Sequence, residues 1–125
     1  MKKILLLSIL LLLLGGVAAF LALRPAQVFG QPFQVAAAVS LAEVLASPAA
    51  HLGADLRTEG RIVRQCPSSG CWFYLDGGNG RQIRVELGHL GMKFPQHVGG
   101  MAEVEGRLLQ HGADLELVGN GARFK

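Results

Sequence analysis

The chain has 125 residues, half of them hydrophobic, and its 12 Lys and Arg side chains outnumber its 9 Asp and Glu side chains by three. The three extra positive charges are Lys2, Lys3 and Arg24, so residues 25–125 have no net charge when histidine is neutral. Nucleic-acid-binding domains draw much of their affinity from basic side chains that neutralise phosphates. The balanced charge therefore argues against a nucleic-acid-binding protein.

The N-terminal segment is apolar from residue 4 to residue 23, apart from Ser8 and two glycines. These 20 residues suffice for a helix across a hydrocarbon core of about 30 Å. Lys2 and Lys3 precede the segment, which places the N-terminus in the cytoplasm. We therefore predict that residues 1–24 are a transmembrane anchor or signal peptide. The anchor gives a single-pass protein of the cytoplasmic membrane with a periplasmic or extracytoplasmic C-terminal domain; cleavage gives a soluble secreted protein.

A tether and one small domain are predicted after this segment. Residues 25–39 contain two prolines and show no clear periodicity, which is typical of a tether. Residues 40–125 are enough for a single domain with a modest core. Ser40 and Glu43 have the spacing of a capping box and predict the start of a helix. Pro48 disfavours helix at Ser47, so this helix is short.

Alternating apolar and polar residues predict five strands, at about residues 56–66, 71–76, 82–87, 102–108 and 114–117. The glycine-rich stretch 76–80 is a hairpin connection. Gly60 and Gly106 lie in similar mid-strand sequences, and such glycines mark tight bends at the corners of barrels. The longest connection, residues 88–100, falls between the third and fourth strands. We therefore predict an all-β, five-stranded, OB-fold-like small barrel with one short N-terminal helix.

The two cysteines flank the turn-forming spacer Pro67–Gly70. In paired strands this spacing brings two cysteines to the Cα separation of a disulfide, about 5.5–6 Å, and an exported compartment is oxidising. We predict a Cys66–Cys71 disulfide. A redox-active pair and a metal site are the alternatives, although the spacing differs from the CxxC motif of thioredoxin-like redox sites.

The stretches EGRIVRQC, GCWFYL and FPQHVGGMAEVEGRL carry a resemblance to a known family. From about Ser40 to Phe124 the chain resembles the exported bacterial OB-fold domains of largely unknown function that have a cysteine, a short spacer and Gly-Cys-Trp. The resemblance implies a barrel outside the cytoplasm and no established activity.

A metal site is possible in the sequence because the 88–101 region is rich in histidine and methionine. Together with Cys66 and Cys71, the residues of this region would form a soft ligand set suited to Cu(I). The alternative function is therefore a periplasmic copper carrier, with the ligands Cys66, Cys71, His89, Met92, His97 and Met101. The competing interpretation is that the methionines fill gaps in the core and the histidines are surface residues.

A partner-binding face is predicted on the second and third strands. Trp72 and Tyr74 share the face opposite Phe73, and this face of an OB-fold is its usual ligand surface. Arginines nearby add positive charge; the predicted binding residues are Arg64, Trp72, Tyr74, Arg81 and Arg84. Trp72 packed on the disulfide or under the tether is the competing interpretation. The expected partner is a protein, peptide or glycan of the cell envelope.

No recognised catalytic motif occurs in the sequence. It lacks a Gly-x-Ser-x-Gly element, a zinc-binding helix and a phosphate loop. We therefore predict a binding or accessory module without catalytic activity and without a cofactor.

Overall fold

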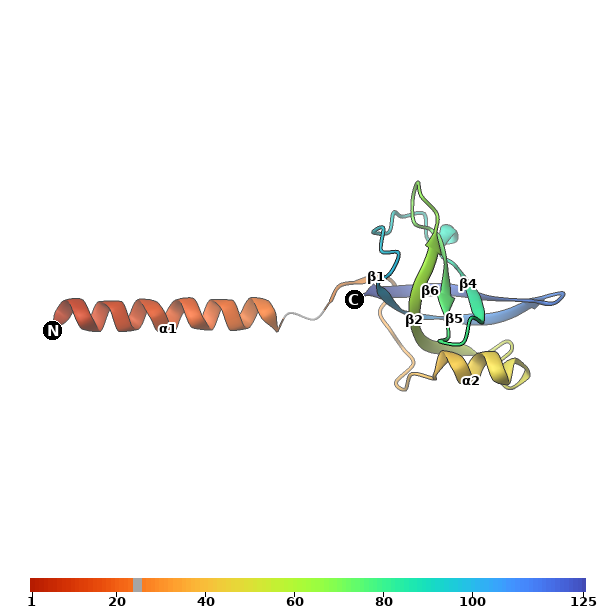
Figure 1. Ribbon diagram of the computed structural model, residues 1–125, viewed down its shortest axis with the longest axis horizontal. Helices are drawn as coiled ribbons and strands as arrows, with labels where there is room; N and C mark the ends of the chain where they lie inside the picture. The colour runs from red at the N-terminus through yellow and green to blue at the C-terminus, as the bar shows by residue number, and fades with distance from the viewer. Residues whose placement is uncertain (24–25) are drawn as a thin grey trace.

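A computed structural model describes residues 1–23 and 26–125 (Figure 1). The predicted boundary between leader and tether, at Arg24 and Pro25, lies outside the described residues. The helices are α1 (Lys2–Ala22) and α2 (Leu41–Ala46), with 3-10 turns η1 (Pro48–Ala50) and η2 (Gly88–Leu90). The strands are β1 (Val28–Gly30), β2 (Asp55–Gln65), β3 (Trp72–Asp76), β4 (Gln82–Glu86), β5 (Met101–His111) and β6 (Asp114–Phe124).

The N-terminal helix α1 projects away from the strands, and none of its residues is buried (Figure 1). Its 21 residues span about 31 Å at a rise of ~1.5 Å per residue. The helix is therefore long and apolar enough to cross a membrane, and a signal sequence has the same properties. It is the one helix of this kind in the described part of the chain.

The strands form one mostly antiparallel sheet in the order β1-β6-β4-β3-β2-β5, and β5 also pairs with β6. The single parallel pair among the described strands joins β4 to β6. The five strands expected from the sequence are confirmed, because β2 to β6 cover the predicted positions. β6 continues beyond the predicted end at residue 117 and reaches Phe124.

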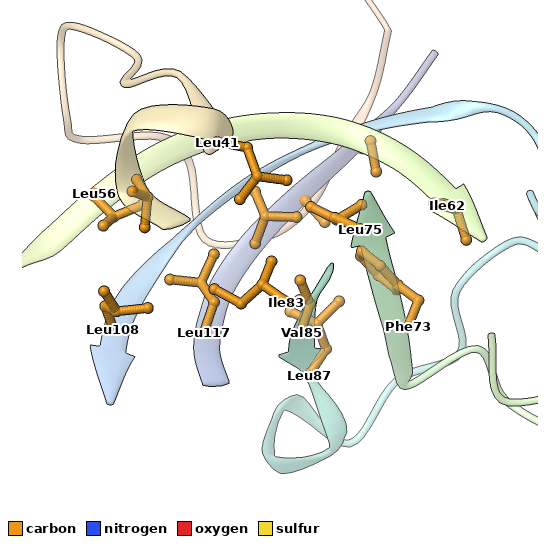
Figure 2. Close-up of a cluster of buried hydrophobic side chains, with 14 of the residues drawn as sticks. Leu41, Leu56, Ile62, Phe73, Leu75, Ile83, Val85, Leu87, Leu108 and Leu117 are labelled. Carbon is orange, nitrogen blue, oxygen red and sulfur yellow. The ribbon is translucent and has the colours of Figure 1, made fainter. Parts of the chain in front are cut away.

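The core lies between the inward faces of β2 to β6, and α2 covers one side of it. Figure 2 shows Leu41 of α2 pointing toward the buried side chains of the strands, among them Leu75 and Ile83. The predicted helix start is confirmed, since the Ser40 hydroxyl accepts a hydrogen bond from the Glu43 amide at 3.5 Å. The buried residues of α2 are Leu41, Val44 and Leu45.

Residues 28–39, called the strap below, contact the sheet over much of their length, whereas the sequence predicted a tether there. β1 pairs with the last part of β6, and the Gln31 amide donates to the Asn120 carbonyl at 2.8 Å. Further along, the Glu105 carboxylate accepts hydrogen bonds from the backbone amides of Gln34 and Val35, each at 2.8 Å. The sequence did not reveal these contacts because the β6 partners of β1 lie about 91 to 95 residues away and Glu105 lies about 70 residues away.

An ion cluster around one buried carboxylate, that of Glu103, lies beside the strap. Glu103 is only 4% exposed and forms ion pairs with Arg57, Arg123 and Lys125. Burial by itself raises the pKa of the Glu103 carboxyl, but hydrogen bonds from Arg123 and Lys125 outweigh burial and leave the pKa below its usual range. The Phe33 ring of the strap covers the guanidinium groups of Arg57 and Arg123, at 5.6 and 5.4 Å. The strap therefore shields these charges from solvent.

The two mid-strand glycines lie where the chain approaches other atoms closely. A Cβ at Gly106 would lie 2.2 Å from the Val118 carbonyl oxygen and 2.7 Å from the Gly119 Cα. The β5–β6 register also shifts between Glu105 and Gly106, as at a β-bulge. At Gly60 the nearest atom would be a Leu41 methyl group at 2.9 Å.

We expect Gly106→Ala to lower the free energy of unfolding by about 1–3 kcal/mol, because the new methyl group meets backbone atoms that cannot move aside. Gly60→Ala is the matched comparison and should cost less, since its closest contact is a leucine methyl group that can shift and its nearest backbone atom, the Asp76 carbonyl oxygen, lies at 3.0 Å rather than 2.2 Å. Guanidinium denaturation of the detergent-solubilised chain, followed by the fluorescence of Trp72, measures both. Equal stability of the two variants would contradict this explanation.

Candidate functional site

The loop between β2 and β3 contains both cysteines and packs against the 94–97 segment. The Cys66 amide donates to the Trp72 carbonyl at 3.0 Å, and the Gly70 amide donates to the Cys66 carbonyl at 3.1 Å. The Phe94 amide donates to the Ser69 carbonyl at 2.9 Å. These bonds hold residues 66–70 in a compact turn.

The predicted Cys66–Cys71 disulfide is wrong for this structure, in which both cysteines are free thiols. The Cys66 sulfur lies 3.3 Å from the Ser68 hydroxyl and 3.7 Å from the Ser69 hydroxyl. The thiol thus interacts within its own turn. The spacing of the cysteines correctly indicated that they lie near each other, but it does not determine how their side chains are oriented.

The environment of Cys66 favours the thiolate. A hydrogen bond from the Ser68 hydroxyl, followed by bonds from the backbone amides of Ser69 and Ser68, lowers the pKa of the Cys66 thiol to about 6. Hydrogen bonds to the charged form of an acid lower its pKa in this way. Cys66 therefore resembles a reactive cysteine in its ionisation, although only 8% of its surface is exposed.

The predicted copper ligands come from the 66–71 loop and from the 88–101 segment. Within residues 1–23 and 26–125, no three His, Cys, Asp or Glu side chains are placed to hold a metal ion. The His97 ring packs edge-on against Phe124, and His89 is exposed on η2. Of the two methionines, Met101 opens β5 and Met92 is exposed.

Four of the five predicted binding residues form one contiguous cluster, which we call the arginine–aromatic face: Arg64, Trp72, Tyr74 and Arg84. The pairing register explains the cluster, since Tyr74 of β3 lies directly opposite Arg64 of β2 and Arg84 of β4. The Trp72 and Tyr74 rings meet edge to face, with centroids 6.1 Å apart. Trp72 is half-buried and its ring lies between the two arginines; it does not pack on a disulfide, because both cysteines are free.

The guanidinium groups of this face lie over the aromatic rings. Arg64 is 4.5 Å from the Tyr74 centroid and 5.6 Å from that of Trp72, and Arg84 is 5.1 Å from that of Trp72. Distances under about 6 Å are those of cation–π contacts. Because Arg64 and Arg84 belong to the strands on either side of β3, they flank Trp72 from both neighbouring strands.

Two glutamates that the sequence analysis did not single out hold Arg84 in place. Arg84 forms ion pairs with Glu86 at 2.8 Å and with Glu116 at 3.5 Å. The hydrogen bond to Glu86, followed by that to the Tyr74 hydroxyl, raises the pKa of Arg84 and outweighs the effect of burial. The sequence alone places Glu86 on the same strand face as Arg84, two residues along β4. It does not place Glu116 there, because that contact depends on the parallel pairing of β4 with β6.

A groove of about 560 Å³ adjoins the arginine–aromatic face. Its walls include Tyr74, Arg81, Arg84, His111, Leu115 and Glu116. Arg81, the fifth predicted binding residue, is therefore in the groove and shares it with Tyr74 and Arg84. Arg64 and Arg81 have no ion-pair partner among the described residues, whereas Arg84 is neutralised locally.

The chain was compared with known proteins. No family model matches it, and no curated protein matches it significantly.

We expect the Cys66 thiol to ionise with a midpoint near pH 6, against about 8.5 for an ordinary cysteine. Because the folded pKa is lowered, the thiolate stabilises the fold fully above the unfolded pKa, and this stabilisation is lost as pH falls through about 6. The ultraviolet absorbance of the thiolate in a Cys71→Ser variant measures the midpoint.

Adding Ser68→Ala to this variant should move the midpoint upward, since the largest cause of the shift is removed. Ser8→Ala, in α1, is the control and should leave the midpoint unchanged. A midpoint near 8.5 before any serine is replaced would contradict the proposed hydrogen bonding.

Proposed function

We propose that this protein is a membrane-anchored, extracytoplasmic binding or accessory module without catalytic activity, built on an OB-fold-like barrel. The strand pairings support the barrel, because they run β2–β3–β4–β6–β5 and return from β5 to β2. The parallel pairing of β4 with β6, the third and fifth of these strands in chain order, and the long connection between β4 and β5 are consistent with an OB-like topology. The sequence resemblance to exported OB-fold domains supports the same proposal.

One observation carries the binding function: the arginine–aromatic face borders a groove of about 560 Å³. Aromatic and arginine side chains are the residues most enriched at the energetic centres of protein interfaces. In this protein these side chains come from β2, β3 and β4, and the contacts between the arginines and the rings fix their positions. Such a preorganised surface loses little side-chain entropy when it binds a partner.

The arrangement of the face favours a partner with carboxylate or other hydrogen-bond-accepting groups. The arginines flank the Trp72 ring, so they restrict the flat stacking of a base or sugar on it. Arg64 lies over the Tyr74 ring and has no ion-pair partner among the described residues, so the N–H groups at its edge suit carboxylates. We therefore propose a protein, peptide or glycan of the cell envelope as the partner, with contacts to Arg64, Trp72, Tyr74, Arg81 and Arg84.

The location rests on α1. Its length and composition suit a membrane span, and Lys2 and Lys3 favour a cytoplasmic N-terminus. The strands then lie outside the cytoplasm.

We expect protease added to intact spheroplasts to digest residues 40–125, because these lie on the outer side of the membrane. The membrane fraction should contain a chain of the full-length mass, with α1 retained. A mass lacking α1 would show cleavage and a secreted product, and full protection from the protease would contradict export.

The binding face is testable through Trp72, which is the only tryptophan of the chain. A photo-crosslinking residue in place of Arg81 should capture the partner in cells, whereas one in place of Arg107, an exposed β5 residue paired with Asp55, should not. Binding of the captured partner should change Trp72 fluorescence. Arg64→Ala and Arg84→Ala should each weaken binding by roughly 10- to 100-fold, the value of a charged hydrogen bond.

Arg107→Ala is the matched control in this titration and should bind as the unmodified chain does. If the arginine–aromatic face is not the binding surface, Arg64→Ala and Arg84→Ala will bind with unchanged affinity, or both crosslinking positions will capture the same proteins.

A further inference from the structure

The docking of the strap leaves little free chain between α1 and the sheet. From Ala22, the last residue of α1, to Val28, the first of β1, there are six Cα–Cα steps. These steps span at most about 22 Å in a fully extended chain. If the chain were free as far as Leu41, the same estimate would give about 68 Å. The β1 end of the sheet is thus confined to within about 22 Å of the end of α1.

The surface at this end is the 91–100 loop. Phe94 of the loop is buried and packs against Phe29 of β1, with ring centroids 6.1 Å apart. Leu90, just before the loop, contacts the strap at Gly30, where a Cβ would lie 3.1 Å from its Cδ1. In Figure 1 the chain enters β1 at the same end of the sheet as the C-terminus. The 91–100 loop therefore lies beside the point where the chain arrives from α1.

The exposed side chains of this loop suit a lipid surface. Val98 is 59% exposed and Met92 is 38% exposed, and they are two of the four large hydrophobic side chains that residues 26–125 expose. Lys93 lies between them and has no ion-pair partner among the described residues. The 88–100 segment contains no Asp or Glu. Apolar residues interspersed with lysine bind the boundary between headgroups and acyl chains, and more strongly where lipids are anionic.

We propose that the 91–100 loop contacts the outer surface of the membrane that holds α1, with Met92 and Val98 at the headgroup boundary and Lys93 facing anionic headgroups. The headgroup layer on each side of a bilayer is about 5–8 Å thick. A connection of at most about 22 Å between α1 and β1 therefore keeps the loop close enough to contact this layer. This inference rests on the anchoring role of α1. It adds that the strap and loop orient the arginine–aromatic face relative to the membrane.

The full-length chain, reconstituted in vesicles of phosphatidylcholine and phosphatidylglycerol with a spin label near the headgroups, tests the proposal. The native tryptophan is first removed by Trp72→Phe. Val98→Trp then reports on the loop, and Ala113→Trp, at the tip of the β5–β6 hairpin, is the matched control. The ten residue steps of β5 between Met101 and His111 separate the two ends by about 33 Å.

We expect the spin label to quench the Val98→Trp fluorescence several-fold more than the Ala113→Trp fluorescence. Adding Lys93→Glu should reduce this quenching in anionic vesicles and have little effect in vesicles of phosphatidylcholine alone. Equal quenching at the two positions would overturn the proposal.

Flotation of the vesicles separates this failure from a failure of the anchor. If the chain floats with the vesicles and the two positions are quenched equally, the membrane contact of the loop is wrong while the anchor stands. If the chain does not float with the vesicles, the anchoring role of α1 is wrong, and the proposed contact is wrong with it.

Discussion

The structure depends on the double pairing of β5. This strand pairs with β2 over its first seven residues and with β6 along its length. Because β4 also pairs with β6, the pairings join β2 to β6 into one continuous set of strands. A strand that lost either partner would leave unpaired backbone groups and expose Val104 and Leu108, which are fully buried. The bend at Gly106 makes the double pairing possible, since the backbone of β6 passes too close there for any side chain.

The polar side of β5 is as important as its apolar side. Glu103 and Glu105 are nearly fully buried, which is costly for a carboxylate unless it is paired. Glu103 has three cationic partners, and Glu105 accepts two backbone amides of the strap. The strap thus satisfies one buried carboxylate and, through Phe33, covers the cations that satisfy the other. A segment whose composition is typical of a linker is in this way part of the folded domain.

The sequence predicted elements whose signal is local. Alternation identified β2 to β5, and Ser40 with Glu43 identified the start of α2. The end of β6 was missed because Gly119, Asn120 and Gly121 interrupt the alternation, although pairing with β5 and β1 keeps the strand extended. β1 has only three residues and exists through its pairing with β6, so no local signal was available. The arginine–aromatic face follows from alternation on neighbouring strands, whereas Glu116 and the groove depend on the β4–β6 pairing. The disulfide was predicted from the spacing of the two cysteines and from an oxidising compartment. Neither determines the direction of the Cys66 side chain, which interacts with Ser68 in its own turn.

The pairing of β1 with β6 also has a consequence for the order in which the domain assembles. β1 is synthesised more than 90 residues before the stretch that it pairs with, Gly121–Arg123. Until that stretch has been synthesised, β1 has no strand to pair with. Docking of the strap at β1 therefore waits for residues 121–123, whereas its contacts with Glu105 can form earlier.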